Sequence, residues 1–212
     1  MSNELRNLDE WSFLKNLNLE EKYNFYKLDG CSHRPPYSGD YDDMVEISQR
    51  EFGITTANDP KPILATDCIS SCVAFCGWSQ KHKVGFLTHY DGLTELNESF
   101  GSLLYWISQS VQDLPTEFDV RLIQGDWSRK EIINFLKARL NMRADIAMKL
   151  VEEDIGGAMS KSIALDTRTG QTYSYDLRLN PKRRELTDLD IMMLISGRSG
   201  ASLVYKPQEL NK

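Results

Sequence analysis

Cysteine and histidine are the residue types in this sequence best suited to covalent chemistry, and both are scarce. The candidates are Cys31, Cys68, Cys72, Cys76, His33, His82 and His89. A cysteine becomes a nucleophile as the thiolate, and a neighbouring imidazole can take its proton and later return one to a leaving group. A cysteine next to a histidine would therefore be sufficient for acyl transfer.

The hydrophobic pattern predicts which cysteine and which histidine meet. Two apolar, β-prone runs, residues 72–78 and 84–90, flank the polar residues 79–82, a pattern that predicts an antiparallel hairpin with a four-residue loop. This register sets Cys72 directly opposite His89. Opposed side chains share a sheet face with Cβ atoms about 4.5–5.5 Å apart, whereas a one-residue slip would put them on opposite faces.

The same residues also have plain structural interpretations. Cys72 could be a small buried apolar residue, and His89 a hydrogen-bonded residue of the core. The even spacing of Cys68, Cys72 and Cys76 could suggest metal ligation. Zinc sites, however, favour two-residue spacers and a second pair of ligands, so we expect no metal here.

Composition restricts the class of protein. The chain has 212 residues, of which 41% are hydrophobic and 26% charged, as in an ordinary folded domain. Its net charge of −6 has the wrong sign for binding a phosphate backbone, so nucleic acid is not an expected partner. The sequence shows neither a long apolar run nor an export signal, and its few clustered cysteines favour reduced thiols, so we expect a cytoplasmic protein without membrane insertion.

Apolar periodicity predicts the elements that must position the hairpin. In chain order they are a helix over 96–114, a strand over 118–124, a helix over 128–140, and a second hairpin of 162–166 with 171–175. Asn97 is expected to cap the first helix, and Ser128 with Glu131 to form a capping box on the second. Gly170 suits the turn of the second hairpin. These elements predict an α/β (α+β) layered sandwich, with a mixed or antiparallel sheet and two main amphipathic helices.

The stretch ATDCISSCVAFCGWSQKHKVGFLTH resembles the CheD family of bacterial chemoreceptor glutamine deamidases. That family has a threonine, then Gly-Ser-Cys-Val-Ala-x-Cys, then a turn and a second strand that ends in histidine. Thr66 lies six residues before Cys72, and His89 lies seventeen residues after it, as in the family. Downstream, EDIGGAMSKSIALDTRTGQTY resembles the family's acidic-x-Gly-Gly stretch, strand and Asp-x-Arg-Thr-Gly turn. The likeness covers roughly residues 44–175.

The resemblance implies a CheD-like fold and a thiol-dependent protein-glutamine deamidase. Cys72 would attack the side-chain carboxamide of a protein-bound glutamine, His89 would protonate the departing ammonia, and Thr66 would orient the imidazole. Backbone N–H groups of Ser71 and Cys72 would hold the oxyanion. The resemblance implies no metal or organic cofactor. It makes the substrate a protein with an exposed glutamine, such as a chemoreceptor, and it makes a chemotaxis phosphatase a candidate docking partner.

Departures from the family pattern leave the choice of substrate open. Ser70 replaces the glycine of the signature, and residues 141–151 look more helical than in the family. We divide the chain into an N-terminal appendage (1–40, with a helix over 8–26), a CheD-like deamidase domain (41–180) and a C-terminal extension (181–212). The alternatives are a CheD-like regulatory module that binds a chemotaxis phosphatase, and a secreted effector that deamidates a host protein.

Overall fold

The computed structural model describes residues 33–111, 113–127, 129–176, 179–180 and 197–208. The elements in chain order are η1 (Tyr41–Asp43), β1 (Met44–Glu46), β2 (Glu51–Thr56), β3 (Ile63–Ile69), β4 (Val73–Ser79), β5 (Val84–Tyr90), α3 (Leu96–Ser110), β6 (Thr116–Gln124), α4 (Lys130–Arg139), β7 (Ile146–Ile155), β8 (Lys161–Asp166), β9 (Thr172–Ser174) and β10 (Ser202–Tyr205). Within these residues, no helix is long and apolar enough to cross a membrane. The predicted helix over 8–26 lies outside the described residues.

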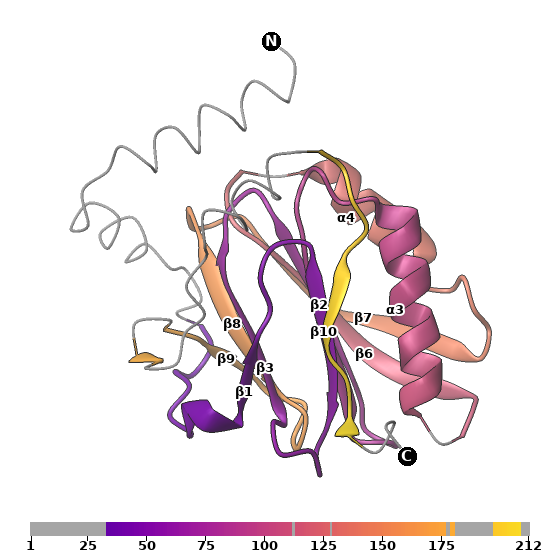
Figure 1. The fold of residues 1–212 in the computed structure, drawn as a ribbon. Helices are drawn as coiled ribbons and strands as arrows, with labels where there is room; N and C mark the ends of the chain where they lie inside the picture. Colours follow the sequence, from indigo (N-terminus) through magenta and orange to yellow (C-terminus); the bar gives the residue numbers. More distant parts are fainter. Residues whose placement is uncertain (1–32, 112, 128, 177–178, 181–196, 209–212) are drawn as a thin grey trace.

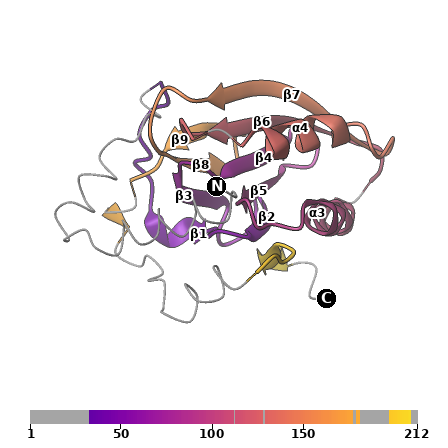
Figure 2. The same ribbon diagram turned by 90° about the horizontal axis from the view of Figure 1, so that it is seen from above.

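The strands form two sheets rather than one. The smaller sheet has the order β1-β3-β8-β9, and the larger has the order β10-β2-β5-β4-β6-β7. Helices α3 and α4 lie on one side of the six-stranded sheet, and the four-stranded sheet lies on the other (Figures 1 and 2). The predicted α+β layered sandwich is therefore confirmed, with mixed pairing in both sheets.

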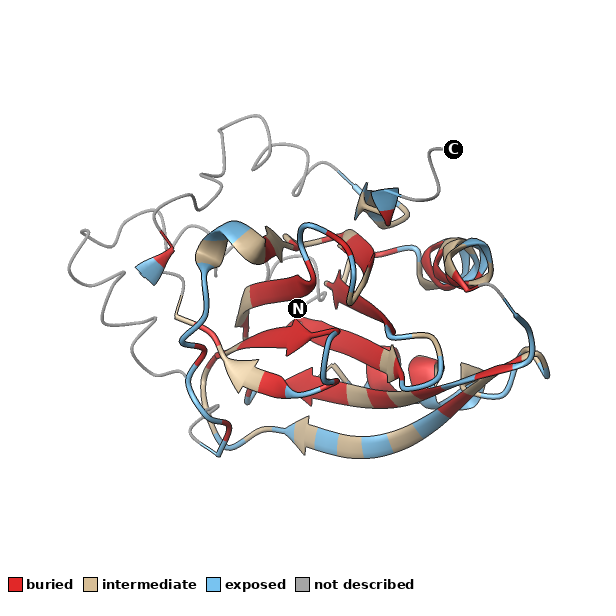
Figure 3. Ribbon diagram, turned by 90° about the horizontal axis from the view of Figure 1, so that it is seen from below, coloured by how far each residue is buried: buried red, intermediate tan, exposed pale blue. Residues whose placement is uncertain are grey.

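Two apolar layers, together with a smaller buried cluster around Tyr37, Ile63 and Ala164, hold these elements together. One layer lies between the helices and the larger sheet and contains an aromatic group, Phe75, Phe86, Phe100 and Phe118. The other lies between the two sheets and contains Cys72, Ala74, Cys76 and Leu87 among other residues. Because both of its faces are covered, β5 is buried along its whole length, and burial is concentrated in the central strands (Figure 3).

The first hairpin forms, but its predicted register is wrong by two residues. Ser79 pairs with Val84, and Ala74, rather than Cys72, pairs with His89. Ser79 stays in the strand because its buried hydroxyl is hydrogen-bonded to that of Thr116 at 3.2 Å. The loop therefore moves to residues 80–83, where Lys83 adopts a left-handed φ of 54°. A shift of two residues keeps the alternation of faces.

Both predicted helices form, but neither capping prediction is correct. The N-cap of α3 is Glu95, whose side chain makes no capping hydrogen bond in the described structure. Asn97 instead accepts a hydrogen bond from Arg139 at 3.0 Å, so its side chain ties the two helices together. The N-cap of α4 is Arg129, so the helix starts too late for the capping box; Ser128 lies outside the described residues.

The segment after α4 is a strand where we expected helical character. β7 runs parallel to β6, and the register between them shifts at Val120/Arg121, where Val151 is the extra residue. Such a bulge reverses which side chains point to a given face. Arg121 therefore shares its face with Glu152, and this places acidic side chains between the two sheets.

Residues near both predicted domain boundaries take part in the sheets. β10, which belongs to the predicted C-terminal extension, pairs parallel with β2. Pro36, in the predicted appendage, forms a parallel bridge with Ser174, and Tyr37 N–H donates to the Ser174 carbonyl at 2.9 Å. These segments are therefore part of the same folded unit.

The second hairpin, β8 with β9, is confirmed, and its turn yields a stability test. Gly170 has a φ of +76°, and a Cβ added there would lie 2.3 Å from the ring of Trp78. Gly157 has a similar φ of +79° but open space around it. We expect Gly157→Ala to lower the free energy of unfolding by about 1–2 kcal/mol, through backbone strain alone. Gly170→Ala should lower it by about 1–3 kcal/mol more than Gly157→Ala does, because the added methyl group also clashes with Trp78.

Urea unfolding of the two variants and the parent protein measures this difference. Equal losses for Gly157→Ala and Gly170→Ala would contradict the packing of Trp78 against the turn.

Candidate functional site

Thr66 and His89 meet across the gap between the two sheets. Thr66 lies on β3 of the smaller sheet, and His89 lies on β5 of the larger sheet. The Thr66 Oγ1 atom is 2.7 Å from His89 Nδ1, and the two residues are only 1% and 2% exposed. A hydrogen bond of this length in a buried setting fixes the orientation of the imidazole.

The second ring nitrogen of His89 is uncommitted. Among the described residues, Nε2 is buried and has no hydrogen-bond partner. Burial lowers the pKa of His89 to about 4, although a hydrogen bond with the Ile47 backbone partly offsets this effect. The ring is therefore neutral at neutral pH. When Nδ1–H donates to Thr66, Nε2 carries the lone pair and can act as a proton acceptor.

Cys72 lies on the same side of the larger sheet as His89. It immediately precedes β4 and packs in the layer between the sheets together with Ala74. Since Ala74 is the direct partner of His89, Cys72 is offset from His89 by two residues along β4. In regular strands such diagonal neighbours are about 7–8 Å apart, a separation that side chains can bridge. The structure therefore places the predicted pair on one face but not directly opposite.

The turn that presents Cys72 has an irregular backbone. Pairing of β3 with β8 is interrupted between Thr66 and Ile69, where Cys68 adopts a left-handed φ of 57°. Ser70 is not among the described residues with positive φ, so the serine at this position carries no left-handed strain. The Ser71 carbonyl accepts a hydrogen bond from Gln124 Nε2 at 3.3 Å.

The other cysteines differ from Cys72 in their surroundings. Cys76 is fully buried, and burial raises the pKa of its thiol to about 11, which makes it a poor nucleophile. Cys68 is half-buried, and its Sγ lies 3.0 Å from Asp67 Oδ2. In the described part of the chain, no group of potential metal ligands contains a cysteine. Cys31 lies outside that part.

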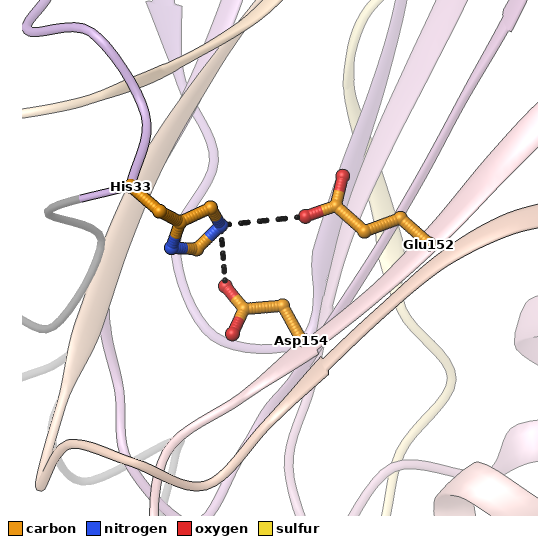
Figure 4. A group of neighbouring side chains, drawn as sticks. All are labelled: His33, Glu152 and Asp154. Atoms are coloured by element: carbon orange, nitrogen blue, oxygen red, sulfur yellow. Dashed lines mark ion pairs between the residues drawn. The ribbon is translucent and has the colours of Figure 1, made fainter.

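A charged cluster that sequence reasoning missed lies between the sheets, near β7. His33 Nε2 is 3.5 Å from both Glu152 and Asp154, and these three residues could hold a metal ion by geometry (Figure 4). The carboxylates, however, already have cationic partners. Arg34 contacts both, at 2.6 Å for Asp154, and Lys161 also pairs with Asp154.

These ion pairs control the charge of Asp154. Burial raises its pKa, but hydrogen bonds from Lys161 and Arg34 outweigh that effect and hold the pKa below its usual range. Arg121 adds a third cation, 3.3 Å from Glu152. Because three cations face two carboxylates, we interpret the cluster as a structural network rather than a metal site. It forms only because the bulge in β7 turns both acids inward, and a single sequence gives no clear sign of such a bulge.

Comparison with known proteins adds little functional information. No protein-family model matches the chain. One similar protein is "Uncharacterized protein R721" of Acanthamoeba polyphaga mimivirus, with 26% identity over 167 residues that cover 66% of this chain and 61% of that protein. The chain thus spans about three-fifths of the length of this relative, whose description names no activity.

The pKa of His89 predicts a specific loss of stability in acid. An unfolded histidine titrates near 6.5, whereas the folded value is about 4, so between these pH values the unfolded chain binds a proton that the folded protein does not. The free energy of unfolding should therefore fall as the pH drops through this window, by up to about 1.4 kcal/mol per pH unit. His89→Gln should flatten that dependence.

Urea unfolding between pH 7 and pH 4, about the range set by the two pKa values, measures the slope. The parent protein, measured in parallel, gives the reference slope. A His89→Gln protein with the parental slope would show that His89 is not the buried neutral base described above.

Proposed function

We propose that the chain is a thiol hydrolase that deamidates glutamine side chains of another protein. Cys72 is the nucleophile, His89 is the general base and acid, and Thr66 orients the imidazole. The observation that carries the proposal is the buried hydrogen bond of 2.7 Å between Thr66 and His89 Nδ1, which leaves Nε2 for proton transfer. The resemblance of these three residues to the CheD signature, in type and spacing, supports the same assignment.

The reaction uses both states of the His89 ring. Nε2 removes the thiol proton, and the Cys72 sulfur attacks the carboxamide carbon of the substrate. The resulting tetrahedral oxyanion is held by backbone N–H groups at Ser71 and Cys72. The imidazolium then protonates the departing nitrogen, the carbon–nitrogen bond breaks and ammonia leaves. Water, deprotonated by His89, hydrolyses the thioester to glutamate and restores the thiol.

The position of Cys72 allows the approach that this reaction needs. Cys72 immediately precedes Val73, the first residue of β4 that pairs with β5. The Cys72 side chain and the imidazole share one face of the larger sheet. Catalytic hydrogen bonds are often long in unliganded enzymes and shorten when substrate binds.

Burial favours a side-chain amide over a peptide bond as the substrate. Cys72 is only 4% exposed, and His89 is 2% exposed. A peptide carbonyl has chain on both sides and needs an open groove, whereas a glutamine side chain is slender and ends in its reactive carbon. The substrate class is therefore a protein with an accessible glutamine, and a chemoreceptor, another bacterial protein and a host protein are all of this class.

Loss of ammonia release tests the proposal. Cys72→Ala should reduce glutamine-dependent ammonia release from an unfolded, glutamine-rich protein to background, while His89→Ala should reduce it by roughly 10²–10⁴-fold. Cys76→Ala removes a similar thiol from the same strand face and should retain activity, provided that the variant is folded. Mass spectrometry of the substrate should show conversion of glutamine to glutamate.

Equal loss of activity in Cys72→Ala and Cys76→Ala proteins that both remain folded would contradict a special role for Cys72. An active Cys72→Ala protein would exclude it as the nucleophile. A regulatory module without activity would release no ammonia from any substrate offered.

A further inference from the structure

Gln124 contacts the residue immediately before the proposed nucleophile. It is the last residue of β6, and its side chain is completely buried. Its Nε2 donates to the carbonyl of Ser71 at 3.3 Å. A single glutamine at the end of an apolar strand carries no recognisable functional signal in the sequence.

The burial of this carboxamide is not explained by stability alone. Its Oε1 atom is buried and has no hydrogen-bond partner among the described residues. An unpaired buried acceptor costs about 1–3 kcal/mol, whereas an apolar side chain of the same shape would avoid that loss. Within the described part of the chain, the hydrogen bond to the Ser71 carbonyl is thus the contact that requires a polar side chain at this position.

The backbone around Gln124 is hydrogen-bonded and lies directly against the turn. The Gln124 carbonyl accepts a hydrogen bond from Gly156 N–H at 3.0 Å. A Cβ added to Gly125 would lie 2.8 Å from the Ile69 carbonyl oxygen and 3.0 Å from Ser70 Cα. The end of β6 therefore forms a fixed platform for the turn between β3 and β4.

Peptide geometry links this platform to Cys72. The Ser71 carbonyl and the Cys72 nitrogen belong to one planar peptide unit, in which the carbonyl and the N–H point in opposite directions. A donor that holds the carbonyl therefore fixes the rotation of the whole unit. The same constraint sets the direction of the Cys72 N–H and the place from which its side chain starts.

We propose that Gln124 is a positioning residue, whose hydrogen bond to the Ser71 carbonyl sets the Cys72 thiol against His89. This inference rests on the proposed function of Cys72 and His89. The side chain of Gln124 is fully buried, and its hydrogen bond in the described structure is to the Ser71 carbonyl. It acts through the Ser71–Cys72 peptide.

A double-mutant cycle on thiol reactivity tests this role without a known substrate. Iodoacetamide alkylation of Cys72, followed by peptide mass mapping, is compared with and without His89→Ala. The ratio of the two rates measures the activation of the thiol by His89, and changes in access to Cys72 cancel when the ratio is taken within one background. In the parent protein we expect a ratio of about ten or more.

The same ratio is measured in three further variants, to show whether the activation of Cys72 by His89 depends on the hydrogen bond from Gln124. Gln124→Met keeps the volume but removes the donor, and the ratio should fall close to one. Gln124→His supplies a ring N–H as donor, so the ratio should lie between that of Gln124→Met and that of the parent protein. Gln109→Met, the same change at an exposed site on α3, should keep the parental ratio. Each variant is tested at a temperature where circular dichroism shows it folded.

The outcomes separate the two proposals. A parental ratio near one would overturn the proposed function, because His89 would not activate Cys72, and the inference would fall with it. A parental ratio that is large and unchanged in Gln124→Met would leave the function standing and overturn the role of Gln124. Equal loss in Gln124→Met and Gln124→His would assign the effect to packing and would also overturn it.

Discussion

The hydrogen bond between Thr66 and His89 is the contact on which the candidate site depends. It joins the central strands of two different sheets, so the distance between the sheets and the position of the ring are fixed together. A threonine hydroxyl is neutral, and it orients the imidazole without adding a charge between the sheets. Burial therefore keeps the ring neutral, with a pKa of about 4, and ready to accept a proton.

The two-sheet architecture explains why such a site can form at all. β4 and β5 have helices on one face and the smaller sheet on the other. The smaller sheet supplies Thr66, a polar hydrogen-bond partner for His89 that is shielded from solvent. Ion pairs made by Arg34 and Lys161 satisfy the acidic side chains that β7 brings to the same interlayer. Among the described residues, polar groups between the sheets are thus paired, except at a few atoms that include His89 Nε2.

Local patterns in the sequence predicted much of this arrangement. The alternation of apolar residues predicted the hairpin. The predicted register was wrong by two residues, and because an even shift keeps each side chain on its face, Cys72 and His89 still share one face of the sheet. The spacing of Thr66, Cys72 and His89, read through the family resemblance, indicated a contact that the structure contains for Thr66 and His89. The remaining features depend on tertiary contacts. Neither the hydrogen bond that keeps Ser79 in its strand nor the splitting into two sheets follows from local sequence.

Covalent trapping is the most direct test of Cys72 as a nucleophile toward a glutamine side chain. A short peptide in which the glutamine carboxamide is replaced by a diazoketone reacts with a thiolate that has been positioned for attack at that group. Peptide mapping after incubation should show a single adduct, on Cys72, and His89→Ala should suppress it. An adduct on Cys68, or an adduct on Cys72 that does not depend on His89, would contradict the account.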